Sequence, residues 1–412
     1  MSDPRPDTVS GLLAEIADIG RDVVRGGYSR PVLSGAELNL REWFVAHADK
    51  RGLEVTTDRN GVIWAWHAPD GSYADAVVTG SHLDSVPGGG AYDGPLGVAS
   101  ALVAFDQLSA AGVGGRPRAI AVFPEEEGSR FGVACLGSRV MTGAIDPVRA
   151  LALADPDGRT FAEALRSAGA TPEHLGPDPE ALSRIGAFVE LHVEQGRGLI
   201  DLGQPVAVGS SILGHGRWRV TLSGAGNHAG TTLMTDRHDP MVAAGALVVR
   251  VRRLAREVSD ARATVGRLVP TPGGTNVIAS RVDLWLDVRH HDDATTLALV
   301  ERIRQEVKFT AAEEGCTAVM VEESFSATVD FDAALRDELC QVLPGAPVLA
   351  TGAGHDAGIL KAHVPAAMLF VRNPTGVSHA PDEAVEDVDA EHGALALART
   401  LERLATRRPS TA

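Results

Sequence analysis

Hydrophobic and polar positions follow two patterns along the first half of the chain, one typical of strands and one typical of helices. Short apolar runs of strand length occur at four places: 62–68, 76–82, 118–126 and 186–196. Longer stretches, with apolar residues three and four positions apart as in helices, cover 36–52 and 96–112. Because strands alternate with helices, the pattern predicts an α/β fold in which helices cover both faces of a mixed sheet.

The pattern changes near Gly214, where alternating strands are combined with two long helices. The expected elements are, in order, 217–224, 240–258, 262–270, 281–290, 294–315 and 317–325. This βαββαβ order makes a complete small α+β unit. After residue 325, helix and strand patterns like those of the first half of the chain return. We therefore expect residues 214–325 to form a domain inserted into a larger one, made of 1–213 and 326–412.

Composition limits the classes of function. With 412 residues, 44% of them hydrophobic, the chain is long enough for two domains. No apolar run approaches the ~20 residues that cross a bilayer, and the start MSDPRPDTVSG lacks the features of a secretory signal. Three scattered cysteines favour the reducing cytoplasm. The net charge of −16 argues against nucleic acid and anionic membranes as partners.

Candidate chemistry gathers where apolar strands give way to polar loops. His82 ends the run AVVTGSH and is followed by Asp84, and the glycines of GGGAYDG let Asp93 reach back toward His82. The triplet Glu125–Glu127 follows the apolar run RAIAVF. Three adjacent carboxylates at a buried edge repel one another and require a cation or shared protons. These loops therefore indicate a metal site with a general base at the carboxyl edge of the sheet.

Each of these residues also has an ordinary explanation. His82 and Asp84 fit a polar strand end, Asp93 fits a glycine-rich turn, and the glutamates fit an exposed acidic loop. Taken alone, His192 in ELHVEQG is a structural histidine and His379 in GVSHAPDE is a turn residue. Their joint position at strand ends of one α/β domain favours a functional site.

A series of ordered segments between residues 80 and 383 resembles the hydantoinase/carbamoylase branch of the metal-dependent amidohydrolases of the aminoacylase/carboxypeptidase type. The segments are GSHLDSVPGGGAYDGPLGV, EEEGSRF, LGSR, ELHVEQG, GAGNHAGTT, GGTNVIAS, DVRH, GAGHDA and GVSHAPDE. A match of this breadth is specific for the family, but it does not select a substrate within it.

The resemblance implies a site for two divalent metal ions, zinc or else manganese, cobalt or nickel. His82, Asp93 and His192 would bind one ion, and Glu127 and His379 would bind the other, with Asp93 as the bridge. No expected ligand is missing from the sequence.

The same resemblance implies the catalytic and substrate-binding residues. Glu126 would be the general base, Asp84 would orient His82, and His228 would donate to the oxyanion. The substrate contacts would be Arg289, Asn276, Arg217, Gln195 and His355. For Arg217, a charge on the surface of a strand is an equally good explanation.

The implied reaction is hydrolysis of a carbamoyl or ureido C–N bond in a small carboxylate substrate. Allantoate is the first candidate, N-carbamoyl-L-amino acids and β-ureidopropionate are alternatives, and aminoacylase or dipeptidase activity is less favoured. A catalytically dead binding protein is disfavoured by the intact ligand set. The inserted domain would act as a lid and pair two subunits in a homodimer, with His228 and Asn276 serving either their own site or the neighbour's.

Overall fold

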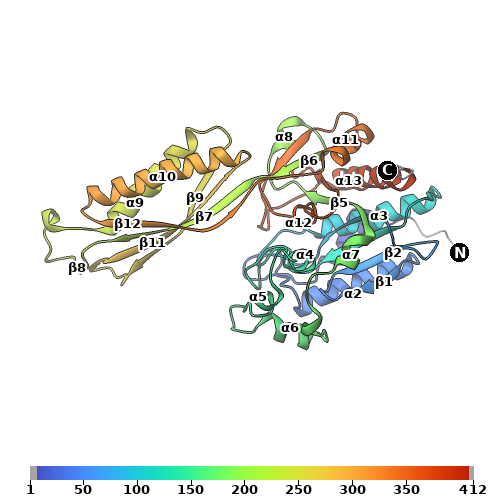
Figure 1. Cartoon of the computed structure of the whole chain (residues 1–412), viewed down its shortest axis with the longest axis horizontal. Helices are drawn as coiled ribbons and strands as arrows, with labels where there is room; N and C mark the ends of the chain where they lie inside the picture. The colour runs from blue at the N-terminus through green and yellow to red at the C-terminus, as the bar shows by residue number, and fades with distance from the viewer. Residues whose placement is uncertain (1–6, 408–412) are drawn as a thin grey trace. The chain divides into compact units, whose positions relative to one another are not determined.

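Two units make up the chain in the computed structural model, which describes residues 7–407 (Figure 1). Unit 1 comprises Met1–Ser210 and Asp330–Ala412, and unit 2 comprises Ser211–Val329. Each unit has a sheet and a hydrophobic core of its own. Within the described residues, no helix is both long and apolar enough to span a membrane.

Among the described residues, a nine-stranded mixed sheet carries unit 1, in the order β1-β2-β4-β3-β5-β15-β6-β13, with β14 paired to β6. β3 is parallel to β4 and β5, and β5 is parallel to β15. β2 and β6 run antiparallel to their neighbours β4 and β15. The strands are β1 (Glu54–Thr57), β2 (Ile63–His67), β3 (Ala76–His82), β4 (Arg118–Phe123), β5 (Ile185–Val193), β6 (Val206–Ile212), β13 (Val329–Asp330), β14 (Val348–Thr351) and β15 (Ala366–Val371).

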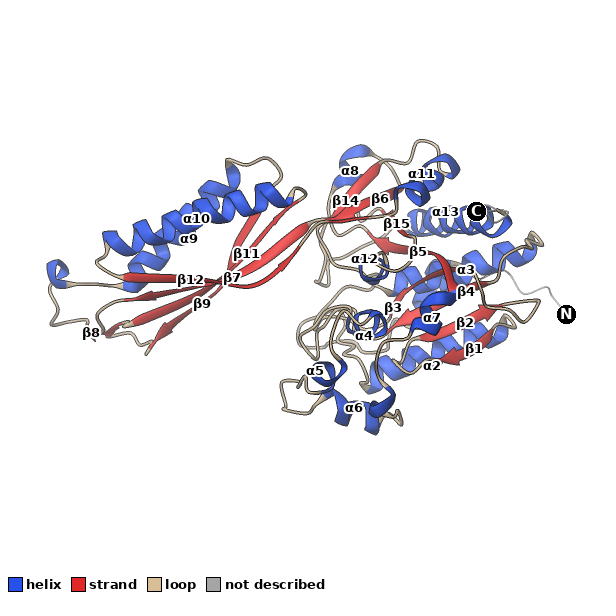
Figure 2. Ribbon diagram, viewed as in Figure 1, coloured by secondary structure: helices blue, strands red, loops and turns tan. Residues whose placement is uncertain are grey.

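Helices lie on both faces of this sheet, as predicted (Figure 2). One face packs its apolar side chains, such as Leu191 and Val371, against helices. These are α1 (Val9–Glu15), α2 (Gly35–Lys50), α3 (Pro95–Ala110), α11 (Ala333–Val342) and α13 (Asp387–Thr406). Successive strand residues point to opposite faces. His192 and Phe370 therefore face the other side, where their rings neighbour His355 at the start of α12 (Asp356–Leu360).

Glycine allows α3 to cross the sheet closely. A Cβ atom at Gly97 would lie 2.3 Å from the carbonyl oxygen of Leu191 in β5 and 2.8 Å from Cβ of Ser81 in β3. The close crossing anchors the start of α3, and with it the loop that leads from β3 into the helix.

The parallel strands end at one edge of the sheet. His82, the last residue of β3, is in register with Phe123, the last residue of β4, and His192 near the end of β5 is in register with Phe370 of β15. The loops that follow these four strands therefore start side by side. They carry the polar residues singled out from the sequence.

No helix or strand was predicted for the segment between β4 and β5. It folds into short helices over a small core of its own that includes Phe131, Leu136 and Phe161. These helices are α4 (Leu136–Thr142), α5 (Pro147–Leu151), α6 (Phe161–Ser167), the 3-10 turn η1 (Pro172–His174) and α7 (Pro179–Arg184). Another short helix, α8 (Gly198–Leu202), follows β5.

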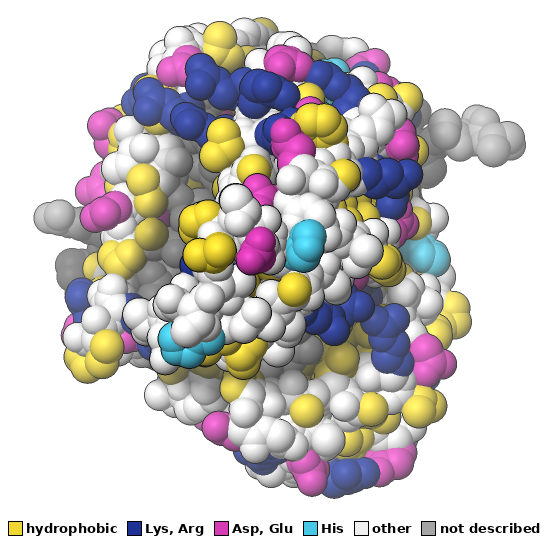
Figure 3. All heavy atoms as spheres, turned by 90° about the vertical axis from the view of Figure 1, so that its left-hand side faces the viewer, with side chains coloured by type: hydrophobic (Ala, Val, Ile, Leu, Met, Phe, Trp, Pro, Cys, Tyr) yellow, Lys and Arg dark blue, Asp and Glu magenta, His cyan; other side chains and the backbone are white. Residues whose placement is uncertain are grey.

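Unit 2 is a four-stranded antiparallel sheet in the order β12-β7-β11-β9, packed against two helices. Its main elements are β7 (Gly214–Ser223), α9 (Pro240–Arg256), β9 (Arg262–Thr271), β11 (Arg281–His290), α10 (Asp293–Glu313) and β12 (Thr317–Ser326), which confirms the predicted βαββαβ order. The prediction omitted the pair β8 (Asn227–His228) and β10 (Val277–Ile278) and the turn η2 (Met234–Asp236). On the face drawn in Figure 3, basic, acidic and hydrophobic side chains are interspersed.

Candidate metal centre

Asp93 lies at the centre of the polar cluster at the sheet edge. Its Oδ1 is 3.4 Å from Nε2 of His82 and 3.2 Å from Nε2 of His192, and its Oδ2 is 3.4 Å from Nε2 of His379. Oε2 of Glu127 is 3.3 Å from the same His379 nitrogen. Two groups that could hold a metal ion result, His82–Asp93–His192 and Asp93–Glu127–His379. Within each group the ligand atoms all lie within 4.8 Å of one another.

The two buried imidazoles direct one nitrogen each toward Asp93. Nδ1 of His82 lies 3.0 Å from the backbone oxygen of Asp84, and Nδ1 of His192 lies 3.0 Å from the backbone oxygen of Val193. A carbonyl only accepts, so Nδ1 carries a proton and Nε2, directed at Asp93, is the nitrogen left to bind a second proton or a metal ion. Both Nε2 atoms are buried and have no hydrogen-bond partner among residues 7–407. Buried nitrogens without a hydrogen-bond partner beside a carboxylate fit a site for a cation.

Asp84 makes a different contact from the one expected. Its backbone oxygen, not its carboxylate, holds His82, since Oδ1 lies 3.7 Å from Nδ1. The carboxylate instead accepts the backbone N–H of Glu126 at 3.2 Å and of Glu127 at 3.1 Å. Asp84 thus links the loop after β3 to the loop after β4.

The three consecutive glutamates have three different surroundings. Glu125, which had no predicted role, accepts the backbone N–H of Arg130 and of Phe131 and so closes the loop in which it lies. Glu126 is buried, with Oε2 3.7 Å from Nε2 of His82. Glu127 contacts His379. The left-handed conformation of Glu125 (φ 54°) helps to turn the neighbouring side chains apart.

Burial and mutual repulsion keep protons on these carboxyl groups. Burial raises the pKa of Glu125 to about 8, and the charge of Asp84 adds to the rise. Burial raises the pKa of Glu127 to about 7, helped by the charge of Asp93. Burial also raises the pKa of Glu126 well above its ordinary value, although His82 opposes the shift.

Asp93 behaves in the opposite way because imidazoles surround it. Burial opposes its ionisation, but His192, His379 and His82 together hold the pKa of Asp93 well below its ordinary value. The contact with Asp93 in turn raises the pKa of His379 to about 9, with Glu127 adding to the rise against the effect of burial. The centre therefore combines an ionised aspartate with glutamates that retain protons.

Two predicted substrate contacts also lie in this cluster. Nε2 of Gln195 donates to Oδ2 of Asp93 at 2.9 Å and to Oγ of Ser378 at 3.0 Å. The ring centroid of His355 is 4.5 Å from that of His192, and its Nδ1 is 3.9 Å from Oε1 of Glu126. Burial, with the neighbouring His192, lowers the pKa of His355 well below its ordinary value, which makes it a neutral imidazole.

The remaining predicted residues belong to unit 2 and form two neighbouring pairs there. Arg289 in β11 donates to Asp287 at 2.7 and 3.0 Å, and Arg217 in β7 lies opposite Asp287 in the strand register, 3.8 Å from its carboxylate. His228 in β8 is exposed, and the chain next to it binds the backbone oxygen of Asn276 through the N–H of Ala229.

Sequence reasoning missed several polar residues at the centre. They are Ser378 and Glu383 around His379, Glu190 near His192, Asp356 next to His355, and Cys135, whose thiol donates to Oε1 of Glu126 at 3.5 Å. Most of them lie within the segments that carry the family resemblance. Their closeness in sequence to a predicted site residue could therefore have pointed to them. Cys135 carried no such signal.

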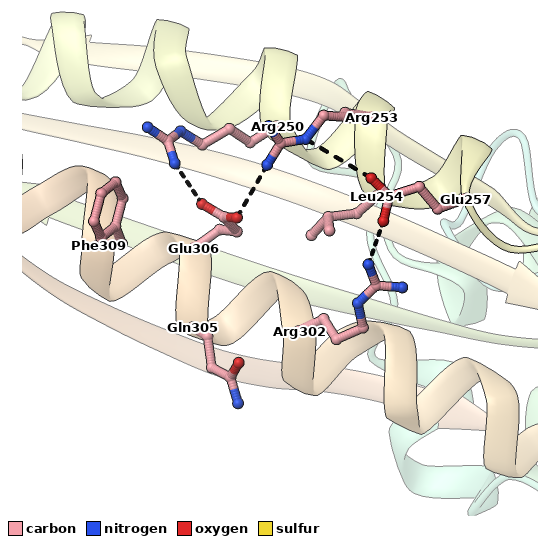
Figure 4. A pocket seen from close by; sticks show the side chains of 8 residues that line it. All are labelled: Arg250, Arg253, Leu254, Glu257, Arg302, Gln305, Glu306 and Phe309. Atoms are coloured by element: carbon pink, nitrogen blue, oxygen red, sulfur yellow. Dashed lines mark hydrogen bonds and ion pairs between the residues drawn. The ribbon is translucent and has the colours of Figure 1, made fainter.

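Unit 2 also has a groove between α9 and α10, lined by Arg250, Arg253, Leu254, Glu257, Arg302, Gln305, Glu306 and Phe309 (Figure 4). Its charges pair with one another. Arg250 contacts Glu306 at 2.7 Å, and Arg302 contacts Glu257. The groove thus differs from the cluster around Asp93, where Nε2 of His82 and of His192 has no hydrogen-bond partner within the part of the chain that the structure describes.

Comparison with known proteins gives a consistent result. Residues 78–403 match the model of peptidase family M20/M25/M40. The chain is 33% identical to the N-carbamoyl-L-amino acid amidohydrolase of Geobacillus stearothermophilus, over 95% of this chain and 97% of that protein. It is 32% identical to the allantoate amidohydrolase of Escherichia coli (strain K12), over 96% of this chain and 97% of that protein. A crystal structure of an amidase of the hydantoinase/carbamoylase family from Burkholderia multivorans superposes with a TM-score of 0.86, at 31% identity and 97% coverage of both chains.

The protonation states at the centre predict how metal binding depends on pH. A ligand must lose its proton before it binds. Without a metal ion, His379 with a pKa of about 9 and Glu127 with a pKa of about 7 both hold protons at pH 6. The affinity for Zn²⁺ should therefore rise between pH 6 and 9, about tenfold per pH unit for each proton displaced. Chelator competition across this range measures it, and an affinity independent of pH would contradict these assignments.

Proposed function

We propose that this chain, which belongs to peptidase family M20/M25/M40 and within it to the hydantoinase/carbamoylase amidases, hydrolyses the carbamoyl or ureido C–N bond of a small carboxylate substrate. The family makes it a metal-dependent hydrolase of the allantoate amidohydrolase and carbamoylase type. The observation that carries the proposal is the pair of ligand groups that share Asp93.

Two divalent ions fit this arrangement. His82, Asp93 and His192 would hold one, and Glu127 and His379 would hold the other, with Asp93 touching both. Imidazole and carboxylate ligands admit zinc, manganese, cobalt or nickel. When bound, such ions polarise a substrate carbonyl and lower the pKa of water.

Glu126 is suited to move the proton in this reaction. Its carboxylate is buried beside His82 without being part of either ligand group, and its raised pKa favours proton uptake. Glu126 would accept a proton from water and deliver it to the leaving nitrogen. His355, as a neutral imidazole, would donate a hydrogen bond to the substrate, and Gln195 would be a further substrate contact.

Unit 2 would supply the recognition of the substrate carboxylate. Arg289 offers a planar pair of donors, a geometry it already uses toward Asp287. His228 in β8 and Asn276, which directly precedes β10, are both exposed, lie close together in unit 2 and would donate to the oxyanion and to the substrate. Arg217, opposite Asp287, is a further candidate contact.

Allantoate is the first substrate that we propose, and N-carbamoyl-L-amino acids are the second, since relatives with either activity resemble the chain to a similar degree. With one water, a carbamoyl substrate yields the free amine, carbon dioxide and ammonia.

Turnover by the metal-loaded protein should occur with ureido substrates and depend on Glu126. Ammonia release is measured with allantoate, N-carbamoyl-L-amino acids and β-ureidopropionate, alongside amino acid release from N-acetyl amino acids and dipeptides. Glu126→Gln should lower kcat by about 10²- to 10⁴-fold, the usual contribution of a general base, with metal content unchanged. Release of amino acid solely from acetyl or peptide substrates would contradict the carbamoylase assignment. Loss of metal from the Glu126→Gln variant would mean that Glu126 is the metal ligand and Glu127 the general base.

Arg289→Lys should raise KM about tenfold, since a point charge loses the paired geometry toward a carboxylate, while kcat changes less. Arg281→Lys is the matched control, because Arg281 lies in the same strand and makes a similar paired contact with Asp283. Steady-state kinetics on the best substrate compare the two variants. Equal KM values for both would remove Arg289 from the proposed substrate contacts.

We also propose that the chain forms a homodimer through unit 2. The surface of α9 exposes apolar side chains, among them Met241, Val242 and Val249, of which Val249 is 69% exposed. An apolar stripe along a helix surface is typical of a protein interface.

Val249→Asp should convert the dimer to a monomer in sedimentation velocity, because a charge would be buried without a partner. Val148→Asp is the control, since Val148 in α5 of unit 1 is 75% exposed. A wild-type protein that sediments as a monomer at all concentrations would refute the dimer.

A further inference from the structure

Glu383 is a buried carboxylate beside the metal centre that belongs to neither ligand group. It lies in the loop after β15, shortly past His379, and is 4% exposed. Its Oε2 accepts the backbone N–H of Tyr92 and of Asp93, each at 3.0 Å. Its Oε1 is buried and has no hydrogen-bond partner among the residues that the structure describes. The contact joins Asp93 to a residue 290 positions away in the sequence.

The loop that carries Asp93 is shaped to receive this carboxylate. A Cβ atom at Gly90 would lie 2.1 Å from Oε2 of Glu383 and 2.5 Å from its Cδ. Gly90 is not among the residues with a positive φ, so the requirement for glycine here is space and not backbone conformation.

A second contact holds the same loop at an earlier point. Tyr28 and Gly89 exchange backbone hydrogen bonds of 2.9 Å in both directions. That contact secures the loop as a whole, whereas the contact from Glu383 falls on Asp93 itself. The peptide N–H of Asp93 sets where its Cα lies, and hence which way its two carboxylate oxygens point toward the three imidazoles.

We propose that Glu383 is a positioning residue that holds Asp93 in the orientation needed to contact both metal ions. It acts through the backbone N–H groups of Tyr92 and Asp93 and not by touching metal or substrate. This inference rests on the proposed function, because Asp93 has to serve two ions only in a dinuclear enzyme. Groups that orient metal ligands typically affect metal affinity or activity by about 10- to 100-fold when they are replaced.

Substitutions of Glu383 that change its shape and its charge separately distinguish a positioning role from a role of its charge. Glu383→Gln keeps an oxygen that can accept the same two N–H groups. Glu383→Asp keeps the charge but is one methylene too short, and Glu383→Ala loses both. Gly90→Ala disturbs the same contact from the other side. Asp178→Ala is the matched control, since Asp178 is also buried and accepts a backbone N–H, that of Ala181, in α7.

The experiment measures Zn²⁺ affinity by chelator competition, the visible spectrum of the Co²⁺-loaded protein, and thermal unfolding of the apoprotein. Glu383→Ala, Glu383→Asp and Gly90→Ala should bind Zn²⁺ about 10- to 100-fold more weakly and alter the Co²⁺ spectrum. Glu383→Gln should retain the affinity and spectrum of the wild type. Asp178→Ala should lower the unfolding temperature without changing either metal readout.

Wild-type metal affinity and Co²⁺ spectrum in folded Glu383→Ala and Glu383→Asp would overturn the inference. So would weak binding by Glu383→Gln together with wild-type binding by Glu383→Asp, since charge and not position would then be decisive. Failure of the proposed function has a different signature. The wild-type protein would then bind metal and hydrolyse none of the ureido substrates, whatever the Glu383 variants do to metal affinity.

Discussion

The contact of one ionised aspartate with three imidazoles is the interaction on which the centre depends. Burying an unpaired carboxylate is costly, and burying several imidazoles side by side is costly when they carry protons. The mixture of charges reduces both costs. Burial alone would lower the pKa of His82, whereas Glu126, Asp93 and Asp84 raise it well above its ordinary value. His82, His192 and His379 in return keep Asp93 ionised. Each partner therefore favours the charged form of the other.

The fold produces this contact through strand direction. β3, β4, β5 and β15 are parallel neighbours in register, so the loops that leave them begin at one edge, although they are far apart in the sequence. Ligands of α/β proteins bind at this edge for the same reason. Glycine then allows close approach. Gly97 brings α3 onto β5, and Gly94 leaves room for the His82 ring, which a Cβ atom there would meet at 2.6 Å.

The sequence predicted those parts of the molecule that depend on side-chain pattern. Apolar runs ended by polar or glycine residues located β3 at 76–82 and β11 at 281–290 with the bounds that are observed. The segment between β4 and β5 could not be predicted because its helices are short, and their stability comes from contacts among themselves and not from a long apolar stripe.

Within the site, ligand-type residues could be anticipated from strand ends and family segments, whereas their supporting contacts could not. Asp84 was expected to use its carboxylate on His82, yet it uses a backbone oxygen. Hydrogen bonds to the backbone carry no signature in residue type, because any loop of the right geometry offers the same N–H groups. Such contacts become visible only when distant segments are brought together in three dimensions.

One arrangement recurs around the centre and explains its unusual charge. Asp84, Glu125 and Glu383 each accept the N–H groups of two consecutive residues, and so each fixes one loop. Glycine-rich and polar loops need such hydrogen bonds to keep one conformation. The accepting carboxylates are themselves buried, and burial together with the charge of Asp93 raises the pKa of Glu383 to about 7. The residues that preorganise the loops therefore also create an excess of negative charge. Without a metal ion protons offset that excess, and bound divalent cations would take the place of these protons.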